Sequence, residues 1–474
     1  MLENFIISRI KAELPFVPNT EKDALFERLG CFLVSSTPRK CFLLKGYAGT
    51  GKTSVVSALV RAMEKLQQTC VLLAPTGRAA KVLAHYSGYP AFTIHKWIYR
   101  QDSATSDTFS LAENKFTHTL FIIDEASMIS ASDQRLTTSE IFGSGSLLTD
   151  LIRYVYSGEG CSMLLLGDDA QLPPVGSTTS KALEPDFLAG YGLVVSDFTL
   201  TQVARQALDS DILSNATALR TNLATHNYDY TIKAGTTLHI LDHKDVLEQL
   251  ENSYREAGPE QTLIVTRSNK RTNLYNQGVR ARILWKEDAV SNGDRLMISK
   301  NNYFWTVEYD NLPFLANGDM VEIVRLRNER ELYGYRFADA SLRLIDYDYE
   351  VDAIIWIDTL FTDSPDKSYA MQRDLFAKIA EDYPEIRNKK ELIKTIRANE
   401  YYNALQVRFA YAVTCHKAQG GQWENVFIDP GNTDFSQATD EEKRDFIRWL
   451  YTAITRATEH VFMLNFKTNE QTSA

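Results

Sequence analysis

The stretch GYAGTGKT, at residues 46–53, fits the pattern G-x-x-x-x-G-K-[ST] at every position. It follows the apolar run at residues 41–44 and precedes apolar residues at helical spacing between Ser54 and Gln67. Backbone N–H groups and a helix N-terminus bind phosphate in such a strand, glycine-rich turn and helix. We therefore predict a loop that binds a nucleoside triphosphate.

Each residue type in this loop has an expected task. Lys52 can reach the β- and γ-phosphates, and the Thr53 hydroxyl can hold Mg²⁺. ATP and Mg²⁺ are accordingly the expected cofactors. The residues expected to bind the nucleotide are Gly46, Ala48, Gly49, Thr50, Gly51, Lys52, Thr53 and Ser54.

The composition indicates a globular, cytoplasmic protein. The chain has 474 residues, 44% of them hydrophobic, which is enough for several buried cores. Its five cysteines are scattered without the spacing of a zinc site, so we expect reduced core residues. We expect no membrane partner, because no leader and no apolar run of about 18 residues is present. The formal charge of −10 argues against a protein that coats nucleic acid with its whole surface.

Three further apolar runs end in polar residues, as the first one does. They lie at residues 70–74, 120–123 and 163–166, and helical stretches separate them. This alternation predicts a parallel sheet buried on both faces. Because such sheets bind ligands at the carboxyl ends of their strands, we expect the four strand ends to meet at one nucleotide.

The rest of the chain predicts two more kinds of structure. The first forty residues are expected to form a helical lead-in, and the polar stretch at 101–115 a surface excursion or small hairpin. A second α/β unit begins near residue 200, and strand-like segments with turn signals predict a small barrel inserted in it. The predicted domains are 1–199 for the first, 200–290 and 403–474 for the second, and 291–402 for the insertion, in which 370–399 is helical.

An acidic pair, Asp124 and Glu125, ends the run at 120–123. The first carboxylate can orient Mg²⁺ and the second can polarise the attacking water. Gln171, after the fourth run, can sense the γ-phosphate through one hydrogen bond. A solvated acidic pair without a catalytic role is the alternative.

Two arginines can supply the charge that phosphoryl transfer needs and that the loop lacks. Arg205 lies in LTQVARQ and Arg456 in YTAITRA. An ordinary surface position is the alternative for each. The second unit has no phosphate loop of its own, so the nucleotide is expected between the two units.

The ordered set of motifs resembles the superfamily 1 helicases, specifically the B-type RecD and Dda group. The motifs are GYAGTGKT, APTGRAAK, TIHKW, IIDEASM, LLGDDAQLPPVG, LTQVARQ, VTCHKAQGGQW and YTAITRA, from residue 46 to about residue 460. The resemblance implies two RecA-like P-loop domains, an SH3-like barrel in the second, and a separation pin at about 101–115. It also implies 5′ to 3′ movement on single-stranded DNA and unwinding of duplex, driven by ATP hydrolysis through Lys52, Thr53, Asp124, Glu125, Gln171, Arg205 and Arg456.

The resemblance further implies which residues hold the DNA. They are Pro75, Thr76, Arg78, Thr93, His95, Thr414, His416 and Lys417. His95, Trp97 or Trp423 could also stack on bases, at roughly 1–3 kcal/mol each, or could instead pack helices onto the sheets. The implied partners are single-stranded DNA and duplex junctions, bound by a monomer, with repair or replication proteins as candidates beyond them.

One position departs from the family pattern. Lys22 stands about where relatives present a glutamine to adenine, which puts adenine selectivity in doubt. Two other functions stay open at this point. One is an RNA helicase, because phosphate contacts do not exclude a 2′-hydroxyl. The other is an ATP-gated clamp that binds single strands and recruits a partner without unwinding.

Overall fold

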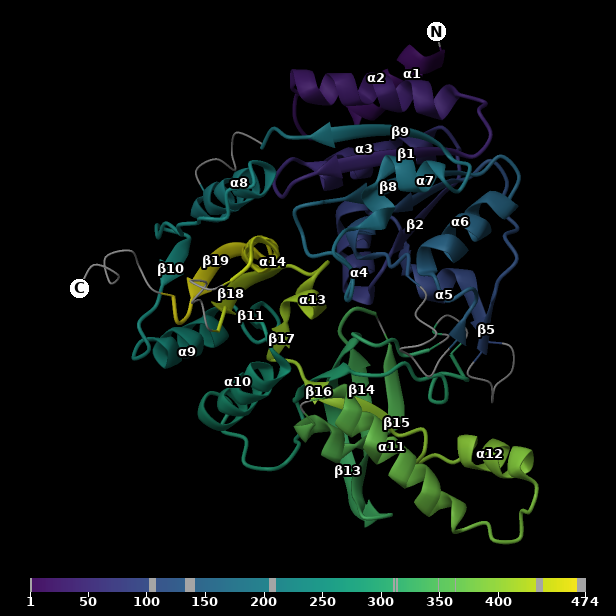
Figure 1. Ribbon diagram of the computed structural model, residues 1–474, viewed down its shortest axis with the longest axis vertical. Coiled ribbons are helices and arrows are strands. Elements are labelled where there is room, and N and C mark those ends of the chain that lie inside the picture. The colour runs from purple at the N-terminus through teal and green to yellow at the C-terminus, as the bar shows by residue number, and fades with distance from the viewer. Residues whose placement is uncertain are drawn as a thin grey trace.

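The computed structural model describes residues 2–101, 108–132, 141–203, 210–309, 312, 314–347, 349–362, 364–431 and 438–466. Two helices open the chain, α1 (Leu2–Ala12) and α2 (Thr20–Val34), and confirm the helical lead-in. Their apolar faces share one core with the phosphate-loop helix α3 (Lys52–Lys65) and with the strand before it. Figure 1 shows them above the first sheet.

The first sheet is parallel throughout, in the order β3-β2-β6-β8-β1-β9. Residues of the inner strands β2, β6 and β8 are buried at every position, as expected for a sheet covered on both faces. Its strands are β1 (Lys40–Gly46), β2 (Cys70–Ala74), β3 (Ala91–Thr93), β6 (Leu120–Ile123), β8 (Ser162–Gly167) and β9 (Val194–Leu200). The helical elements that follow these strands, besides α3, are α4 (Gly77–Ser87), α5 (Ile94–Ile98), η1 (Ala126–Met128), α6 (Leu147–Ser157), η2 (Lys181–Leu183) and α7 (Pro185–Ala189).

A small sheet interrupts this unit where a hairpin was expected. The strands β4 (Tyr99–Gln101) and β5 (Thr108–Leu111) pair antiparallel, and β7 (Ile141–Phe142) joins β5. Phe109 stacks on Phe142 with ring centroids 4.6 Å apart, and its centroid lies 4.4 Å from that of Tyr303. The small sheet is thereby attached to the region around residue 303.

The second large sheet is also parallel, in the order β10-β19-β18-β11-β17. Its strands are β10 (Leu238–Ile240), β11 (Thr262–Thr266), β17 (Ala412–Thr414), β18 (Trp423–Asp429) and β19 (Ala457–Met463). Its helices are α8 (Asp211–Ala224), α9 (Val246–Glu256), α10 (Asn269–Arg282), α13 (Cys415–Ala418) and α14 (Asp440–Ile454). In Figure 1 this unit lies beside the first sheet, with α8 and α14 nearest to it.

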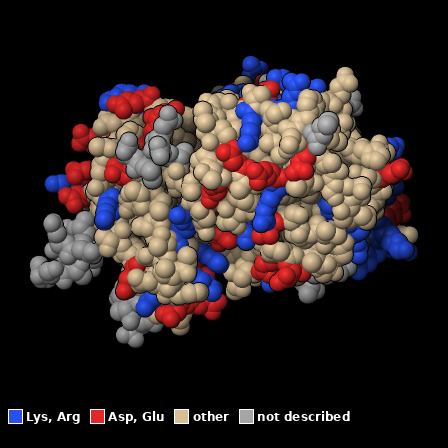
Figure 2. Space-filling model, turned by 90° about the horizontal axis from the view of Figure 1, so that it is seen from above, with Lys and Arg blue, Asp and Glu red and all other residues tan. Residues whose placement is uncertain are grey.

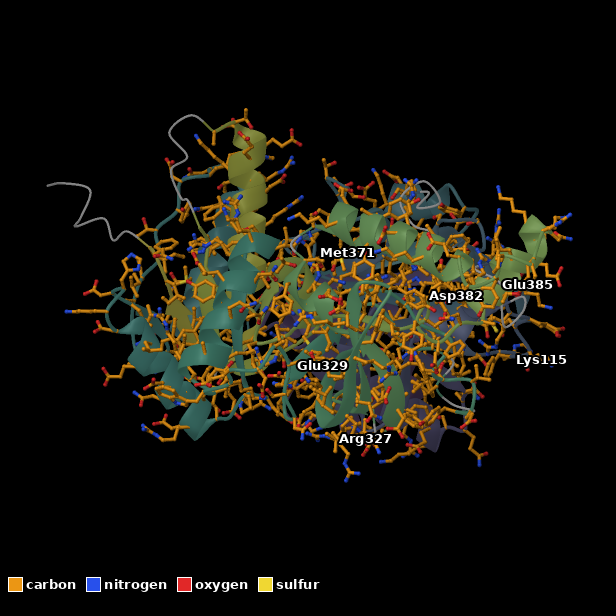
Figure 3. All side chains as sticks on the ribbon, turned by 90° about the horizontal axis from the view of Figure 1, so that it is seen from below. Lys115, Arg327, Glu329, Met371, Asp382 and Glu385 are labelled. Atoms are coloured by element: carbon orange, nitrogen blue, oxygen red, sulfur yellow. The ribbon has the colours of Figure 1, made fainter. Side chains whose placement is uncertain are left out.

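A closed barrel of five strands lies below both sheets in Figure 1. The strands are β12 (Arg295–Ile298), β13 (Met320–Leu332), β14 (Tyr335–Leu344), β15 (Glu350–Trp356) and β16 (Leu405–Phe409). The helical elements η4 (Ile357–Phe361), α11 (Pro365–Ala380) and α12 (Lys389–Arg397) join β15 to β16. Seen from below in Figure 3, Arg327 of β13 points away from the barrel into solvent. The α/β class with an inserted barrel is confirmed.

The barrel corrects one detail of the sequence prediction. The apolar run at residues 409–413 was expected to be one strand of the second sheet. Instead β16 ends at Phe409 and closes the barrel against β12, and β17 starts at Ala412 in the sheet. The chain changes direction at Tyr411, whose hydroxyl donates to Asp294 Oδ1 at 2.8 Å. A strand that lies beyond residue 402 is thus part of the barrel.

Cysteine exposure, surface charge and helix hydrophobicity were also predicted from the sequence. Four of the cysteines are buried, but Cys31 is exposed, so the expectation of a core position is wrong for that residue. On the face shown in Figure 2, basic and acidic side chains are interspersed. None of the described helices combines the length and apolar character that a membrane crossing requires.

Candidate nucleotide and nucleic-acid site

The phosphate loop has the backbone shape that its glycines allow. Gly49 and Gly51 have φ angles of +76° and +88°, a region that strains other residues. Thr50 is buried and its hydroxyl donates to the carbonyl of Tyr47 at 2.8 Å. Helix α3 begins at Lys52, so Thr53 and Ser54 lie in its first turn, with their N–H groups near the loop. This arrangement fits a bound phosphate chain.

Lys52 lies inside the loop. Its ammonium group donates to the carbonyl oxygens of Gly46 and Tyr47, the latter at 3.2 Å. Burial raises the pKa of Asp124 and of Glu125, and the charge of Lys52 opposes both shifts. Lys52 and the acidic pair thus lie within electrostatic reach of one another, as the order of strands β1, β8 and β6 requires.

Glu125 has an unusual backbone. Its φ angle is +50°, which costs free energy for a residue with a side chain. Its N–H donates to Asp124 Oδ1 at 2.8 Å, so the two residues form a single tight turn. A strained turn at the end of a buried strand is characteristic of a functional position, and a merely solvated acidic pair would not need it.

Arg456 faces this acidic pair from the second unit. Its side chain is only 5% exposed, and its guanidinium donates to the carbonyls of Thr452 and Gly421 at 3.0 and 3.2 Å. Its charge lowers the pKa of Glu125 and is the largest influence opposing burial there. An ordinary surface position is therefore excluded for Arg456.

Tyr451 lies in the last turn of α14, five residues before Arg456, and joins the two units directly. Its hydroxyl donates to Asp168 Oδ2 at 2.6 Å and accepts the N–H of Ala48 at 3.0 Å. One side chain of the second unit thereby contacts both the phosphate loop and the residue that follows β8.

The segment after β8 is attached to the second unit at two more points. The N–H of Leu172 donates to Thr452 Oγ1 at 2.9 Å, and Gln419 Nε2 donates to the Leu172 carbonyl at 2.9 Å. Gln171, immediately before Leu172, is 5% exposed, and its Oε1 has no hydrogen-bond partner among the residues described. Gln171 thus keeps one acceptor unused at the boundary of the two units.

Arg205 lies outside the described residues. The helix that follows it, α8, brings a different arginine to the loop: Arg220 lies 4.1 Å over the ring of Tyr47. Leu213 of the same helix lies against Gly49, where a Cβ atom would be 3.1 Å from its side chain. Helix α8 therefore covers the outer side of the phosphate loop.

Three of the threonines expected at the nucleic-acid site begin helices. Thr76 and Thr93 accept hydrogen bonds from backbone N–H groups in the first turns of α4 and α5, at 3.2 and 3.3 Å. Thr414 also precedes a helix, α13, but its side chain makes no capping hydrogen bond, and that helix contains His416 and Lys417. Pro75 lies between β2 and Thr76. Helix N-termini favour phosphate, which suits contacts with a nucleic-acid backbone.

Cations from both units meet the barrel. Arg78 pairs with Asp346 at 3.2 Å, and Lys96 pairs with Asp319 at 3.2 Å. Lys417 Nζ donates to Asn317 Oδ1 at 2.7 Å. These contacts place the predicted cations Arg78 and Lys417 where the two large sheets and the barrel meet.

The structure is less favourable to the aromatic candidates. His95 packs on Phe142 and Tyr99, and burial lowers its pKa to about 4, so its ring is neutral. Trp423 is 5% exposed and Arg78 lies 5.2 Å over its ring, which leaves no open face for a base. The packing alternative therefore accounts for both residues.

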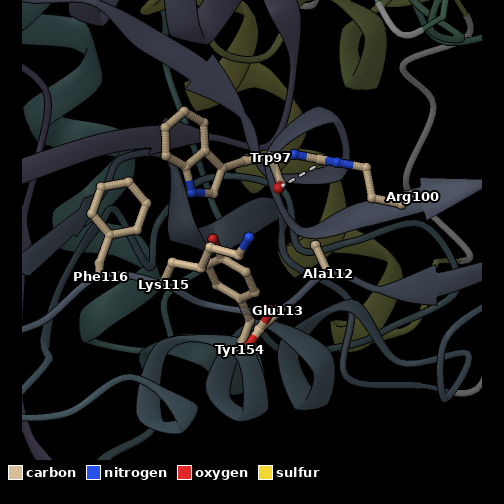
Figure 4. A pocket seen from close by; sticks show the side chains of 7 residues that line it. All are labelled: Trp97, Arg100, Ala112, Glu113, Lys115, Phe116 and Tyr154. Carbon is tan, nitrogen blue, oxygen red and sulfur yellow. Dashed lines mark hydrogen bonds between the residues drawn. The ribbon is translucent and has the colours of Figure 1, made fainter.

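Trp97 both packs against other aromatic rings and lines a pocket. Its ring lies between Phe92 and Phe116, with centroids 4.8 and 5.9 Å away. It also lines a surface pocket of about 560 Å³, and Figure 4 shows its indole nitrogen turned toward that pocket. The pocket is lined by Trp97, Arg100, Ala112, Glu113, Lys115, Phe116 and Tyr154. Packing on Phe92 and Phe116 accounts for much of the ring, and its indole nitrogen is buried without a hydrogen-bond partner among the described residues.

Comparisons with known proteins agree with this geometry. Residues 33–243 match the AAA domain family, and residues 409–464 match the UvrD-like helicase C-terminal domain. The ATP-dependent RecD2 DNA helicase of Deinococcus radiodurans is 28% identical over 43% of this chain and 25% of its own length. The ATP-dependent DNA helicase dda of Enterobacteria phage T4 is 23% identical over 88% of this chain and 93% of its own. The resemblance to B-type superfamily 1 helicases is confirmed.

Two further similarities extend along nearly the whole chain. An uncharacterized protein of Acanthamoeba polyphaga mimivirus is 23% identical over 94% of this chain and 99% of its own. Among solved structures, a Pif1 helicase from Bacteroides in complex with ADP-AlF3 and single-stranded DNA aligns with 96% of this chain and 94% of its own, at 14% identity and a TM-score of 0.47.

Sequence reasoning missed several residues of the helicase site. Tyr451 and Asp168 both lie within motifs that were recognised, but nothing in the motifs shows that the two side chains meet. Arg220 lies in no recognised motif. The only available signal was its position in the helix after LTQVARQ.

Proposed function

We propose that this protein is an ATP-dependent DNA helicase that moves 5′ to 3′ on single-stranded DNA and unwinds duplex. The observation that carries the proposal is the placement of Tyr451 and Arg456, on the second unit, against the phosphate loop and Glu125 of the first. A nucleotide in the loop then lies between two units, so its binding and hydrolysis can change how the units sit together.

In the proposed reaction, Lys52 and the loop N–H groups hold the phosphates, and Glu125 orients the attacking water. Arg456 stabilises the charge that develops on the transferred phosphoryl group, together with Arg205. Gln171 senses the γ-phosphate with its unused oxygen. Closure of the units on ATP and their release after hydrolysis would then drive each step along the strand.

Thr53 and Asp124 are proposed to hold Mg²⁺. A hydroxyl and a carboxylate are oxygen ligands that suit this ion. Asp124 fits the role because its burial raises its pKa, and a nearby cation would offset that cost. When bound, Mg²⁺ would neutralise charge on the β- and γ-phosphates.

The nucleic acid is proposed to lie along the junction of the two sheets and the barrel, on the N-termini of α4, α5 and α13. Arg78 and Lys417 would contact phosphates there, with Thr76, Thr93, Thr414, Pro75 and His416. His95 would support this surface by packing. The barrel is proposed to be SH3-like. The excursion at 101–115, of which residues 102–107 lie outside the described part of the chain, is proposed to act as a separation pin. The domain boundaries at 199 and 290 and a monomeric state are part of the same proposal, with the insertion ending after β16 instead of at residue 402.

Steady-state ATP hydrolysis with and without single-stranded DNA tests the proposal. We expect DNA to stimulate hydrolysis, and we expect the Lys52→Ala variant to lose it while remaining folded. Stimulation by RNA but not DNA would favour the RNA helicase. DNA binding that depends on ATP, without turnover, would favour the clamp.

A further inference from the structure

Lys22, on α2, is a buried cation with no counterion among the described residues. Its side chain is 4% exposed. A buried ammonium group is normally paired, because desolvation of an unpaired charge is costly. In the described part of the chain, Lys22 Nζ makes no hydrogen bond and no ion pair, and its one ring contact is with Phe16 at 5.6 Å. Such a side chain is poised for a ligand with acceptor atoms.

The adjacent carboxylate is already engaged. Glu21 accepts the N–H and the hydroxyl of Thr201 at 2.8 and 2.7 Å, and the N–H of Gln202 at 3.1 Å. Asn19 donates to Gln202 Oε1 at 2.8 Å. These bonds fix α2 to the end of β9 and direct the Glu21 carboxylate there. Burial consequently lowers the pKa of Lys22, with only partial opposition from the charge of Glu21.

The Lys22 side chain lies beside the phosphate loop. A Cβ atom placed on Gly51 would lie 3.4 Å from Lys22 Cε and 3.9 Å from its Nζ. Gly51 immediately precedes α3, a helix of 14 residues whose N-terminus carries partial positive charge. The Lys22 ammonium group and the N-terminus of α3 therefore both lie beside Gly51, and no described carboxylate pairs with either of them.

We propose that Lys22 binds the nucleotide directly, donating from its ammonium group to acceptor atoms of the phosphates or of the purine. The inference rests on the proposed function, because it requires a nucleotide in the loop. Lysine offers donors and no acceptor, so it cannot accept a hydrogen bond from the adenine amino group. Guanine, in contrast, presents two neighbouring acceptors, N7 and O6. Guanine nucleotides should therefore bind at least as tightly as adenine nucleotides.

The test measures the Kd of the full-length protein for ADP, GDP and inorganic tripolyphosphate. Lys22→Met should raise the Kd for both nucleotides by roughly 10- to 150-fold, the loss of one charged hydrogen bond. A parallel loss of tripolyphosphate binding identifies a phosphate contact, and a loss confined to the nucleotides identifies a purine contact. Lys22→Gln, which can both donate and accept, should shift the preference toward ADP.

Lys40→Met is the matched control. Lys40 lies at the opposite end of β1, and its Nζ donates to the carbonyls of Phe32 and Ser35 at 2.7 and 2.6 Å. Its removal should lower the Tm and leave every Kd unchanged. Lys22→Met should leave the Tm of the nucleotide-free protein unchanged or raise it, because an unpaired buried charge is removed.

Three results would overturn the inference. The first is an unchanged Kd for all three ligands in Lys22→Met while Lys52→Ala abolishes binding, which would leave the proposed function intact. The second is a wild-type protein that binds ADP more than tenfold tighter than GDP while Lys22→Met binds tripolyphosphate as the wild type does, which excludes the purine contact and the phosphate contact together. The third is a wild-type protein that binds none of the ligands, which would overturn the proposed function together with the inference.

Discussion

The hydroxyl of Tyr451 and the carboxylate of Asp168 meet at 2.6 Å across the boundary between the two parallel sheets. The same hydroxyl accepts the N–H of Ala48 in the phosphate loop. A movement of either unit must therefore break or strain a bond that reaches the nucleotide site. In the proposed mechanism, these two bonds couple the nucleotide site to movement of one unit relative to the other.

Tyr451→Phe should uncouple the two units. The substitution leaves Asp168 Oδ2 buried without its donor, and we expect DNA-stimulated ATP hydrolysis to fall about tenfold and stability by about 1–3 kcal/mol. Both are measured by steady-state kinetics and thermal unfolding. Tyr411→Phe is the control, because Tyr411 makes the same kind of bond with Asp294, in the barrel. An equal loss of hydrolysis in both variants would argue against coupling through Tyr451.

Glu125→Gln should abolish turnover and preserve binding. Loss of a group that orients and deprotonates water costs roughly 10²- to 10⁴-fold in rate. ADP and ATP should still bind, because the phosphate contacts come from the loop. Rapid-quench measurement of a single turnover checks the rate, and equilibrium binding checks the affinity. A variant that hydrolyses ATP at the wild-type rate would support the clamp instead.

Glu125 should set the acid limb of the pH profile of kcat, and substitution of Arg456 should move that limb. Burial raises the Glu125 pKa and Arg456 lowers it, so the ionised, active carboxylate is lost as the pH falls through that raised pKa. Arg456→Met should move the acid limb of kcat to higher pH, because the opposing charge is gone. Arg456→Lys keeps the charge and should lower kcat with little movement of the limb. Identical acid limbs in all three proteins would contradict the assignment.

Lys417→Met should weaken binding to single-stranded DNA of any sequence. Removal of one phosphate contact should reduce the slope of log K against log[salt] by about 0.7 for single strands. Desolvation of its ammonium group by neighbouring atoms, with the charge of Arg408, lowers the Lys417 pKa to about 8 although the residue is exposed, so its contribution should decline as the pH rises above 8. Lys11→Met, on α1, provides the control, and its slope should match that of the wild type. Fluorescence anisotropy at several salt concentrations measures the slope for each variant and for the wild type.

The first sheet could be predicted from the sequence because its signals are local. Each buried strand is a continuous apolar run, and the polar residues that follow it, such as Lys52 and Asp124, are fixed at its carboxyl end by the parallel topology. The contact between Tyr451 and Asp168 could not be predicted, since 283 positions separate the two residues and neither motif specifies a partner.

Two other features depended on tertiary context. The run at 409–413 reads as one strand, but the bond from Tyr411 to Asp294 marks the point where the chain leaves the barrel for the sheet. His95 and Trp423 are residue types that bind nucleic acid, yet here both side chains pack against other residues. Burial of a single aromatic side chain is set by how the elements pack, and motif spacing does not report it.

Strand separation tests the central claim most directly. Two duplexes of equal length, one with a single-stranded 5′ DNA tail and one with a 3′ tail, are incubated with ATP and either the wild-type protein or Lys52→Ala. We predict that the wild type unwinds only the 5′-tailed duplex and that the variant unwinds neither. Tail-stimulated ATP hydrolysis with no unwinding of either duplex, or unwinding from the 3′ tail, would contradict the account.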